Sequence, residues 1–136
     1  MDRNRRIKVR RGIVRYIVVH STGTRQDMQV KELEKLPYHY LLTKKGRLIS
    51  LKPFQPKDGT IELAWLGGLD EQGRHVDNRT EEQNESLFTT LLLLSERFPE
   101  AKVVGADQLY VYGFANPGFD IRAWLDDYMP AFLQAA

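Results

Sequence analysis

The segment Tyr16 to Val19 constrains the fold more than any other part of the chain. Its four residues are all apolar and three of them are β-branched, a pattern typical of a strand buried on both faces near the middle of a sheet. His20 and several small polar residues follow directly. The predicted strand therefore ends in a titratable side chain, at a position where sheet-based enzymes often carry catalytic or binding groups.

Apolar periodicity and turn residues along the rest of the chain predict an α/β fold: a central mixed β-sheet of about five strands flanked by helices. A hairpin is expected where glycine at position 46 allows a tight turn. A capping box in residues 80–83 marks the start of a long helix that ends before Pro99, and we expect the C-terminal helix to be interrupted near Pro130. Strands are expected at 13–19, 38–43, 47–52, 61–66 and 101–104, helices at 29–36, 80–98 and from 121 onward, and loops at 22–28, 69–79 and 105–117.

Length and composition favour one globular domain over residues 13–136, because 136 residues with 42% apolar content can bury a real core. The chain has no cysteine, which excludes a disulfide framework and a thiolate metal ligand. No apolar run has the length of a membrane span, and we expect no membrane contact. Residues 1–6 lack the apolar core of a signal peptide, so we expect a cytoplasmic location.

Residues 1–12 form a basic N-terminal arm that carries six cationic side chains. Such an arm could bind nucleic acid. The favoured interpretation is a solvated terminus, since no aromatic residue is interleaved to stack on bases. The six residues are Arg3, Arg5, Arg6, Lys8, Arg10 and Arg11.

An ordered set of short motifs resembles the zinc-dependent N-acetylmuramoyl-L-alanine amidases, a family that includes phage lysozyme-type amidases and peptidoglycan recognition proteins. The match extends from about residue 13 to residue 126. It implies an amidase-like domain of bacterial or phage origin, with a zinc cleft that binds the glycan–peptide junction of cell-wall peptidoglycan. The motifs are VVHSTGT at 18–24, YHY at 38–40, KG at 45–46, LGGLD at 66–70, NRTEEQ at 78–83 and PGFD at 117–120.

The resemblance also identifies where the zinc ligands of this family should lie. A catalytic zinc takes three protein ligands and activates a bound water. The first ligand position holds His20, whereas the second holds Ala106 and the third holds Asn116, neither of which is a suitable ligand. Phe114 stands where phage members carry a basic group, and Tyr38 matches a tyrosine of the family's active site. His20 and Tyr38 are thus expected to be vestigial site residues.

Few other side chains could replace the missing zinc ligands. His39 alternates with Tyr38 on a strand, so it should point away from the cleft and have a structural role. His75 lies in a polar loop and is expected to be solvated. Asp107 could join His20, but two ligands make a weak zinc site. The cleft segment that carries a histidine in the family is shortened here to residues 56–60. We therefore expect no cofactor, whereas active relatives carry zinc.

Aromatic residues near the predicted cleft are candidates for ligand binding. Tyr110, Tyr112 and Phe114 alternate in the loop that follows the last strand. They could line the cleft for a partner or an apolar ligand, or they could fill core space left by the shortened loop. Trp65 is a further ligand-stacking candidate, although a core position is the favoured interpretation.

These observations lead to one main functional hypothesis and two alternatives. The main hypothesis is a pseudoenzyme, an amidase-like domain that binds a peptidoglycan fragment or a protein partner in its former active-site cleft. The first alternative is an active peptidoglycan amidase that hydrolyses the N-acetylmuramoyl–L-alanine amide bond. The second is a nucleic-acid-associated module that uses the basic arm. Because two of three expected ligands are missing, we expect an inactive protein.

Overall fold

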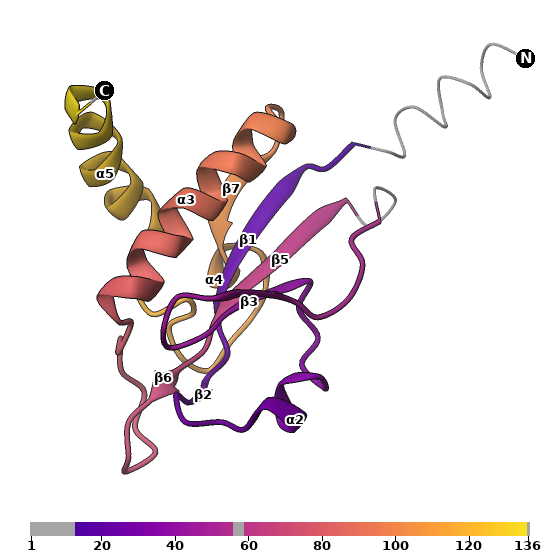
Figure 1. The fold of residues 1–136 in the computed structure, drawn as a ribbon, viewed down its shortest axis with the longest axis vertical. Helices are drawn as coiled ribbons and strands as arrows, with labels where there is room; N and C mark the ends of the chain where they lie inside the picture. Colours follow the sequence, from indigo (N-terminus) through magenta and orange to yellow (C-terminus); the bar gives the residue numbers. More distant parts are fainter. Residues whose placement is uncertain (1–12, 56–58, 136) are drawn as a thin grey trace, which may run out of the picture.

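A five-stranded mixed sheet forms the centre of the computed structural model, which describes residues 13–55 and 59–135 and, at the C-terminus, the side chains up to residue 128 (Figure 1). The strand order is β4-β3-β5-β1-β7, and only the β3–β4 pair is antiparallel. The predicted α/β class and strand number are confirmed; the basic arm, residues 1–12, lies outside the described residues. The strands are β1 (Tyr16–Ser21), β3 (Tyr40–Leu42), β4 (Leu48–Ser50), β5 (Thr60–Trp65) and β7 (Lys102–Gly105).

Strand β1 is buried along five of its six residues, as its apolar run predicts. It lies between β5 and β7, parallel to both, so neither of its edges is free along Tyr16 to Val19. A strand enclosed in this way must be apolar on both faces. The register pairs His20 with Ala64 and Val18 with Glu62, which places all four side chains on the same face of the sheet.

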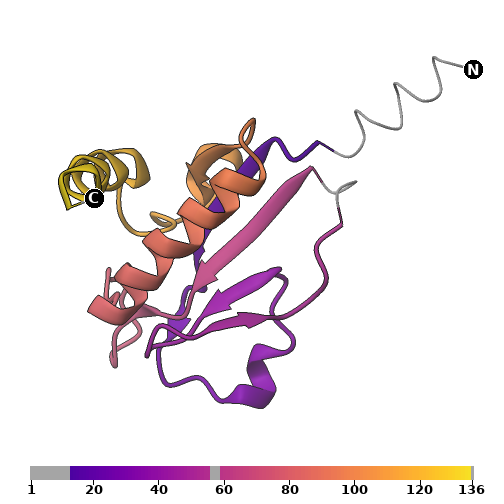
Figure 2. The same cartoon turned by 45° about the horizontal axis from the view of Figure 1, so that its top comes forward.

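The two faces of the sheet carry cores of different size. The larger core contains Ile17, Val19 and Trp65, and it packs against α3 (Glu81–Arg97) and α5 (Ile121–Ala135). Figure 2 shows α3 running along the sheet, with α5 beside it. The smaller core lies on the His20 face next to α2 (Val30–Leu33) and consists of Leu33, Leu41, Ala64 and Leu66. None of the described helices is long and apolar enough to cross a membrane.

The predicted capping box at the start of α3 is confirmed. The backbone N–H of Gln83 donates to the Thr80 hydroxyl at 3.1 Å, and the Thr80 N–H donates to the Gln83 side-chain oxygen at 3.0 Å. The Gln83 amide group also donates to the Leu66 carbonyl at 2.9 Å and to the Leu42 carbonyl at 3.3 Å. The start of α3 is thereby joined to the ends of β3 and β5, around a fully buried polar side chain.

Several predicted boundaries are wrong. The predicted loop at 22–28 contains β2 (Thr24–Arg25), and the predicted loop at 69–79 begins inside β6 (Gly68–Leu69). These two strands form a parallel pair that is too short to give a periodic signal. The loop at 105–117 begins with the helical turn α4 (Ala106–Leu109). The helix α2 is shorter than the predicted 29–36. Helix α5 continues past Pro130, because a proline removes one backbone donor while the remaining hydrogen bonds of the helix can persist.

Candidate functional site

The candidate site is centred on His20, which lies buried near the end of β1. Its Nε2 atom is 2.6 Å from Oε1 of Glu62, a residue of β5. The parallel register explains the contact, because Glu62 lies two residues before Ala64, the partner of His20, and so projects from the same face. An ionised carboxylate can only accept a hydrogen bond, so Nε2 carries the proton.

Two tyrosines from the chain after β7 complete the arrangement. The Tyr110 hydroxyl donates to both carboxylate oxygens of Glu62, at 3.3 and 3.1 Å, and the Tyr112 hydroxyl lies 3.3 Å from Nδ1 of His20. The Tyr110 ring stacks on the imidazole with centroids 5.9 Å apart, and the Tyr38 ring lies at 4.9 Å. We refer to His20, Glu62, Tyr110 and Tyr112 as the His20–Glu62 network.

Burial and hydrogen bonding set the charge states of this site. Burial raises the pKa of Glu62, but hydrogen bonds from His20, Thr60 and Tyr110 outweigh burial and hold that pKa below its usual value. Burial raises the pKa of Tyr38 to about 12, with smaller contributions from Tyr112 and Glu62. Burial and the Glu62 carboxylate raise the pKa of Tyr110 to about 12. At neutral pH the site therefore contains a carboxylate and protonated phenols that act as donors rather than nucleophiles.

These residues do not fit the zinc ion that the resemblance implies. A catalytic zinc needs three protein ligands with free lone pairs, and both ring nitrogens of His20 already have protein partners. At the other two positions, Ala106 is fully buried at the start of α4, and Asn116 is hydrogen-bonded to the backbone of Ser21. Across residues 13–55 and 59–135 no group of three or more His, Cys, Asp or Glu side chains could hold a metal ion.

Asn116 has a structural task that explains its amide group. Strand β7 ends at Gly105, opposite Val19, so the backbone of Ser21 has no strand partner on that side. The Ser21 N–H donates to Oδ1 of Asn116 at 2.8 Å, and Nδ2 of Asn116 donates to the Ser21 carbonyl at 3.4 Å. The buried amide thus replaces a missing neighbouring strand, and it needs both its donor and its acceptor to do so.

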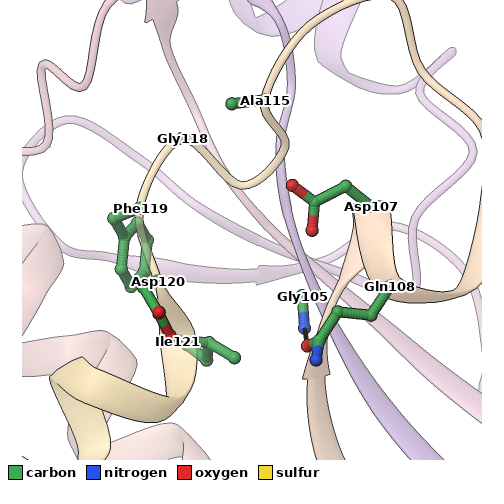
Figure 3. A pocket seen from close by; sticks show the side chains of 8 residues that line it. All are labelled: Gly105, Asp107, Gln108, Ala115, Gly118, Phe119, Asp120 and Ile121. Carbon is green, nitrogen blue, oxygen red and sulfur yellow. Dashed lines mark hydrogen bonds between the residues drawn. The ribbon is translucent and has the colours of Figure 1, made fainter.

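Asp107 faces a separate cavity of about 410 Å³ beyond the end of β7 (Figure 3). Its backbone N–H donates to the Asn116 carbonyl at 2.8 Å, and its Oδ2 accepts from the Asn116 N–H at 3.3 Å. The bonds of Asp107 therefore go to Asn116, and the structure does not pair this carboxylate with His20. The cavity is lined by Gly105, Asp107, Gln108, Ala115, Gly118, Phe119, Asp120 and Ile121.

Trp65 is a core residue, which confirms the favoured interpretation and contradicts the alternative of a ligand-stacking residue. The side chain is 0% exposed, and its indole N–H donates to the Pro117 carbonyl at 3.0 Å. The reason is the alternation of side chains along β5, which places Trp65 and Leu63 on the α3 face and Glu62 on the His20 face. No surface of the indole remains for a ligand.

The two other histidines differ in their surroundings. His39 is buried, and its Nδ1 accepts from the Glu62 backbone N–H at 2.9 Å, so the predicted structural role is confirmed. His75 is exposed as predicted, but its ring stacks on Phe114 with centroids 4.0 Å apart and planes 13° from parallel. This stack joins the loop after β6 to the loop after α4.

The three aromatic residues after β7 form a wall that is partly open to solvent. Tyr110 is 40% exposed, and Tyr112 and Phe114 are half-buried. Phe114 packs over Gly23, where an added Cβ would lie 3.3 Å from the ring in a backbone conformation with positive φ. The hydroxyls of Tyr110 and Tyr112 bond to Glu62 and His20. The role of these aromatic residues as a cleft wall stays a prediction.

Glu62 is the central site residue that the sequence interpretation missed. It is the single charged residue of β5, whose sequence is TIELAW. Because its neighbours are mostly apolar, the pattern predicts a strand without indicating a role for Glu62. A lone carboxylate inside a buried strand is costly unless it is paired, and that signal could have pointed to a partner. The partner itself, 42 residues away, could not be read from the pattern.

Solved structures with the same fold include a phage endolysin and insect peptidoglycan recognition proteins, whereas no family model and no curated protein matches the chain. The endolysin of Thermus scotoductus bacteriophage Ph2119 superposes with a TM-score of 0.64 at 20% identity, over 84% of each chain. PGRP-LB of Drosophila gives 0.57 at 12% identity, over 87% of this chain and 82% of that one. Peptidoglycan Recognition Protein-1 of Manduca sexta gives 0.51 at 13%, over 78% and 73%. The predicted amidase-like and peptidoglycan-recognition-protein-like fold is confirmed.

Proposed function

We propose that this chain is a non-catalytic member of the amidase-like fold that binds a peptidoglycan fragment in its cleft. The observation that carries the proposal is the state of His20, whose two ring nitrogens are bonded within the protein. The two other positions that the resemblance gives to zinc hold Ala106 and Asn116. Hydrolysis of an amide bond by this type of site requires a metal-activated water, whereas binding does not.

Peptidoglycan is the proposed ligand class for two reasons. The fold is shared with an endolysin and with proteins named for peptidoglycan recognition, although a fold alone does not fix a function. The cleft wall also combines ring faces with hydroxyl donors, which suits a ligand that carries both sugar rings and amide carbonyls. The Tyr38 hydroxyl, protonated at neutral pH, is available to donate to such a carbonyl.

Co-sedimentation with purified peptidoglycan sacculi tests binding and hydrolysis in one experiment. The protein is incubated with sacculi in buffers with added ZnCl₂ or with EDTA; the pellet is assayed for protein and the supernatant for new amino groups. We expect protein in the pellet in both buffers and no release of amino groups. Zinc-dependent release of amino groups would establish the active amidase instead, and absence from the pellet would contradict peptidoglycan binding.

A matched pair of variants locates the binding surface. Phe114→Ala removes half of the His75–Phe114 stack, which lines a pocket next to Ser21 at the end of β1. We expect about fivefold weaker sacculus binding, because aromatic contacts of this kind contribute on the order of 1 kcal/mol. Leu93→Ala is the control, since Leu93 is 62% exposed on α3, on the other face of the sheet. Equal binding by both variants would place the ligand outside the cleft.

A protein partner is the second candidate ligand, favoured by an exposed apolar segment beside the cleft. Leu109 and Tyr110 are 38% and 40% exposed, and Val111 is fully exposed. Contiguous apolar surface of this kind often marks a protein interface. Val111→Asp distinguishes the two ligands, because it is expected to abolish capture of a protein partner while leaving sacculus binding intact.

A further inference from the structure

Two segments that are distant in sequence converge on Glu62 in β5. His20 comes from β1, 42 residues away, and Tyr110 comes from the chain after β7, 48 residues away. Tyr112 joins the same cluster through His20, across 92 residues. Binding several remote segments to one central group is what a metal ion does in a metalloprotein. Here the central group is a carboxylate.

The geometry at Glu62 is that of a strong, enclosed hub. Its side chain is 14% exposed and that of His20 is 5% exposed, and the 2.6 Å contact between them is short for a hydrogen bond to an ionised group. Both carboxylate oxygens also accept from the Tyr110 hydroxyl. No buried polar side-chain atom among the described residues lacks a partner, so the cluster is satisfied without any added group.

We infer that Glu62 is a positioning residue that takes the structural place of the metal, fixing the His20 imidazole and fastening the chain after β7 to the sheet. Its carboxylate keeps the proton on Nε2, and this leaves Nδ1 as the acceptor for Tyr112. The two tyrosines are thereby held in the cleft wall. This role goes beyond the proposed function, and it holds whichever ligand the cleft binds.

The role has a direct consequence for metal binding. A metal could reach the imidazole only by replacing Glu62 at Nε2 or Tyr112 at Nδ1, and only His20, among the three positions that the resemblance assigns to ligands, could coordinate it. Zinc binding at His20 would therefore have to break one of these two hydrogen bonds. Zinc should therefore neither bind in stoichiometric amount nor stabilise the native protein.

Thermal unfolding of the full chain, combined with ¹⁵N NMR of the imidazole, tests the inference. For the wild type we expect the same Tm in ZnCl₂ and in EDTA, and an NMR signature of the Nε2-protonated tautomer. Glu62→Ala should lower the Tm by about 10 °C and remove that tautomer preference, because it leaves a buried imidazole without its acceptor. Glu62→Gln should retain the tautomer, since its amide oxygen can still accept from Nε2.

Two further variants keep the test decisive. Glu71→Ala removes an exposed carboxylate in the loop after β6 and should change neither readout. If Glu62→Ala does not fold, Tyr110→Phe removes only one hydroxyl of the network and should raise the mobility of residues 110–112 in NMR relaxation. A zinc-induced rise in Tm, one bound zinc per chain, or an unchanged His20 tautomer in Glu62→Ala would overturn the inference. Sacculus binding is measured separately, so its failure would leave this result standing.

Discussion

The side chain of Asn116 has a structural role at a position where the resemblance expects a zinc ligand. Its amide both accepts from and donates to the backbone of Ser21, and it is almost completely buried. The substitution Asn116→Asp would supply a zinc-binding oxygen, but the carboxylate cannot donate to the Ser21 carbonyl. A zinc ligand introduced at position 116 would therefore lose the hydrogen bond that Asn116 donates to the end of β1.

We predict that Asn116→Asp lowers the free energy of unfolding by about 2–4 kcal/mol, because it buries a charge and leaves a carbonyl unpaired. Urea denaturation measures this loss. Gln72→Glu, a similar change of an exposed amide in the loop after β6, serves as the control and should be nearly neutral. An Asn116→Asp protein as stable as the wild type would refute the assigned role.

The acid side of the pH–stability profile should report on Glu62. Because its pKa is lower in the folded protein than the usual glutamate value of 4.5, the carboxylate contributes stability that is present above pH 4.5 and is lost as the pH falls through the folded-state value. Glu62→Gln lacks this titration. We therefore expect the difference in unfolding free energy between wild type and Glu62→Gln to shrink between pH 5 and pH 3; parallel profiles would contradict the shift.

At the scale of elements, the start of α3 is the joint between the helix layer and the sheet. Gln83 closes the capping box with Thr80 and also reaches the carbonyls of Leu42 and Leu66. Because Gln83 both caps α3 and bonds to two strand carbonyls, the position of the helix depends on this one side-chain amide. The orientation of α3 over the larger core follows from these bonds together with the apolar contacts of Leu87 and Leu91.

Gln83→Glu should separate the two tasks of this side chain. The carboxylate can still accept from the Thr80 N–H, but it cannot donate to the two strand carbonyls, so we expect a loss of about 2–3 kcal/mol in unfolding free energy. Glu82→Gln, in the same turn but exposed, is the control with an expected change within about 0.5 kcal/mol. Thermal denaturation followed by circular dichroism provides the measurement, and equal Tm values for the two variants would contradict the cross-link.

At the scale of the whole molecule, the His20–Glu62 network lies near the carboxyl end of β1, opposite the end at which this strand begins. Strand β1 begins at Tyr16, and His20 is near its other end, where it contacts Tyr112 of the chain that follows β7. Figure 1 shows the course of this strand through the sheet. A ligand held at the proposed cleft would therefore engage the carboxyl end of β1.

Deletion of residues 1–12 tests whether the cleft acts alone. We expect unchanged sacculus binding at physiological salt, because the cleft residues are all retained. Nucleic-acid binding that is strongly salt-dependent and that disappears on the same deletion would instead support the arm as a nucleic-acid-binding segment. A marked loss of sacculus binding would show that the cleft is not sufficient.

The sequence by itself determined the features that local patterns encode. The β-branched run of β1, the hairpin at Gly46 and the capping box at Thr80 each depend on neighbouring residues, and the structure confirms all three. The absence of ligand chemistry at Ala106 and Asn116 is likewise a matter of residue identity at a motif position.

Only the tertiary structure decided what those residues do. The pairing of His20 with Glu62 and that of Ser21 with Asn116 span 42 and 95 residues, and they depend on the register and length of parallel strands. The face on which Trp65 lies depends on the same register. Connections between parallel strands are long, so periodicity within each strand carries no information about which residues of two strands meet. The amidase-like outline could thus be predicted from the sequence, whereas the network that holds its cleft could not.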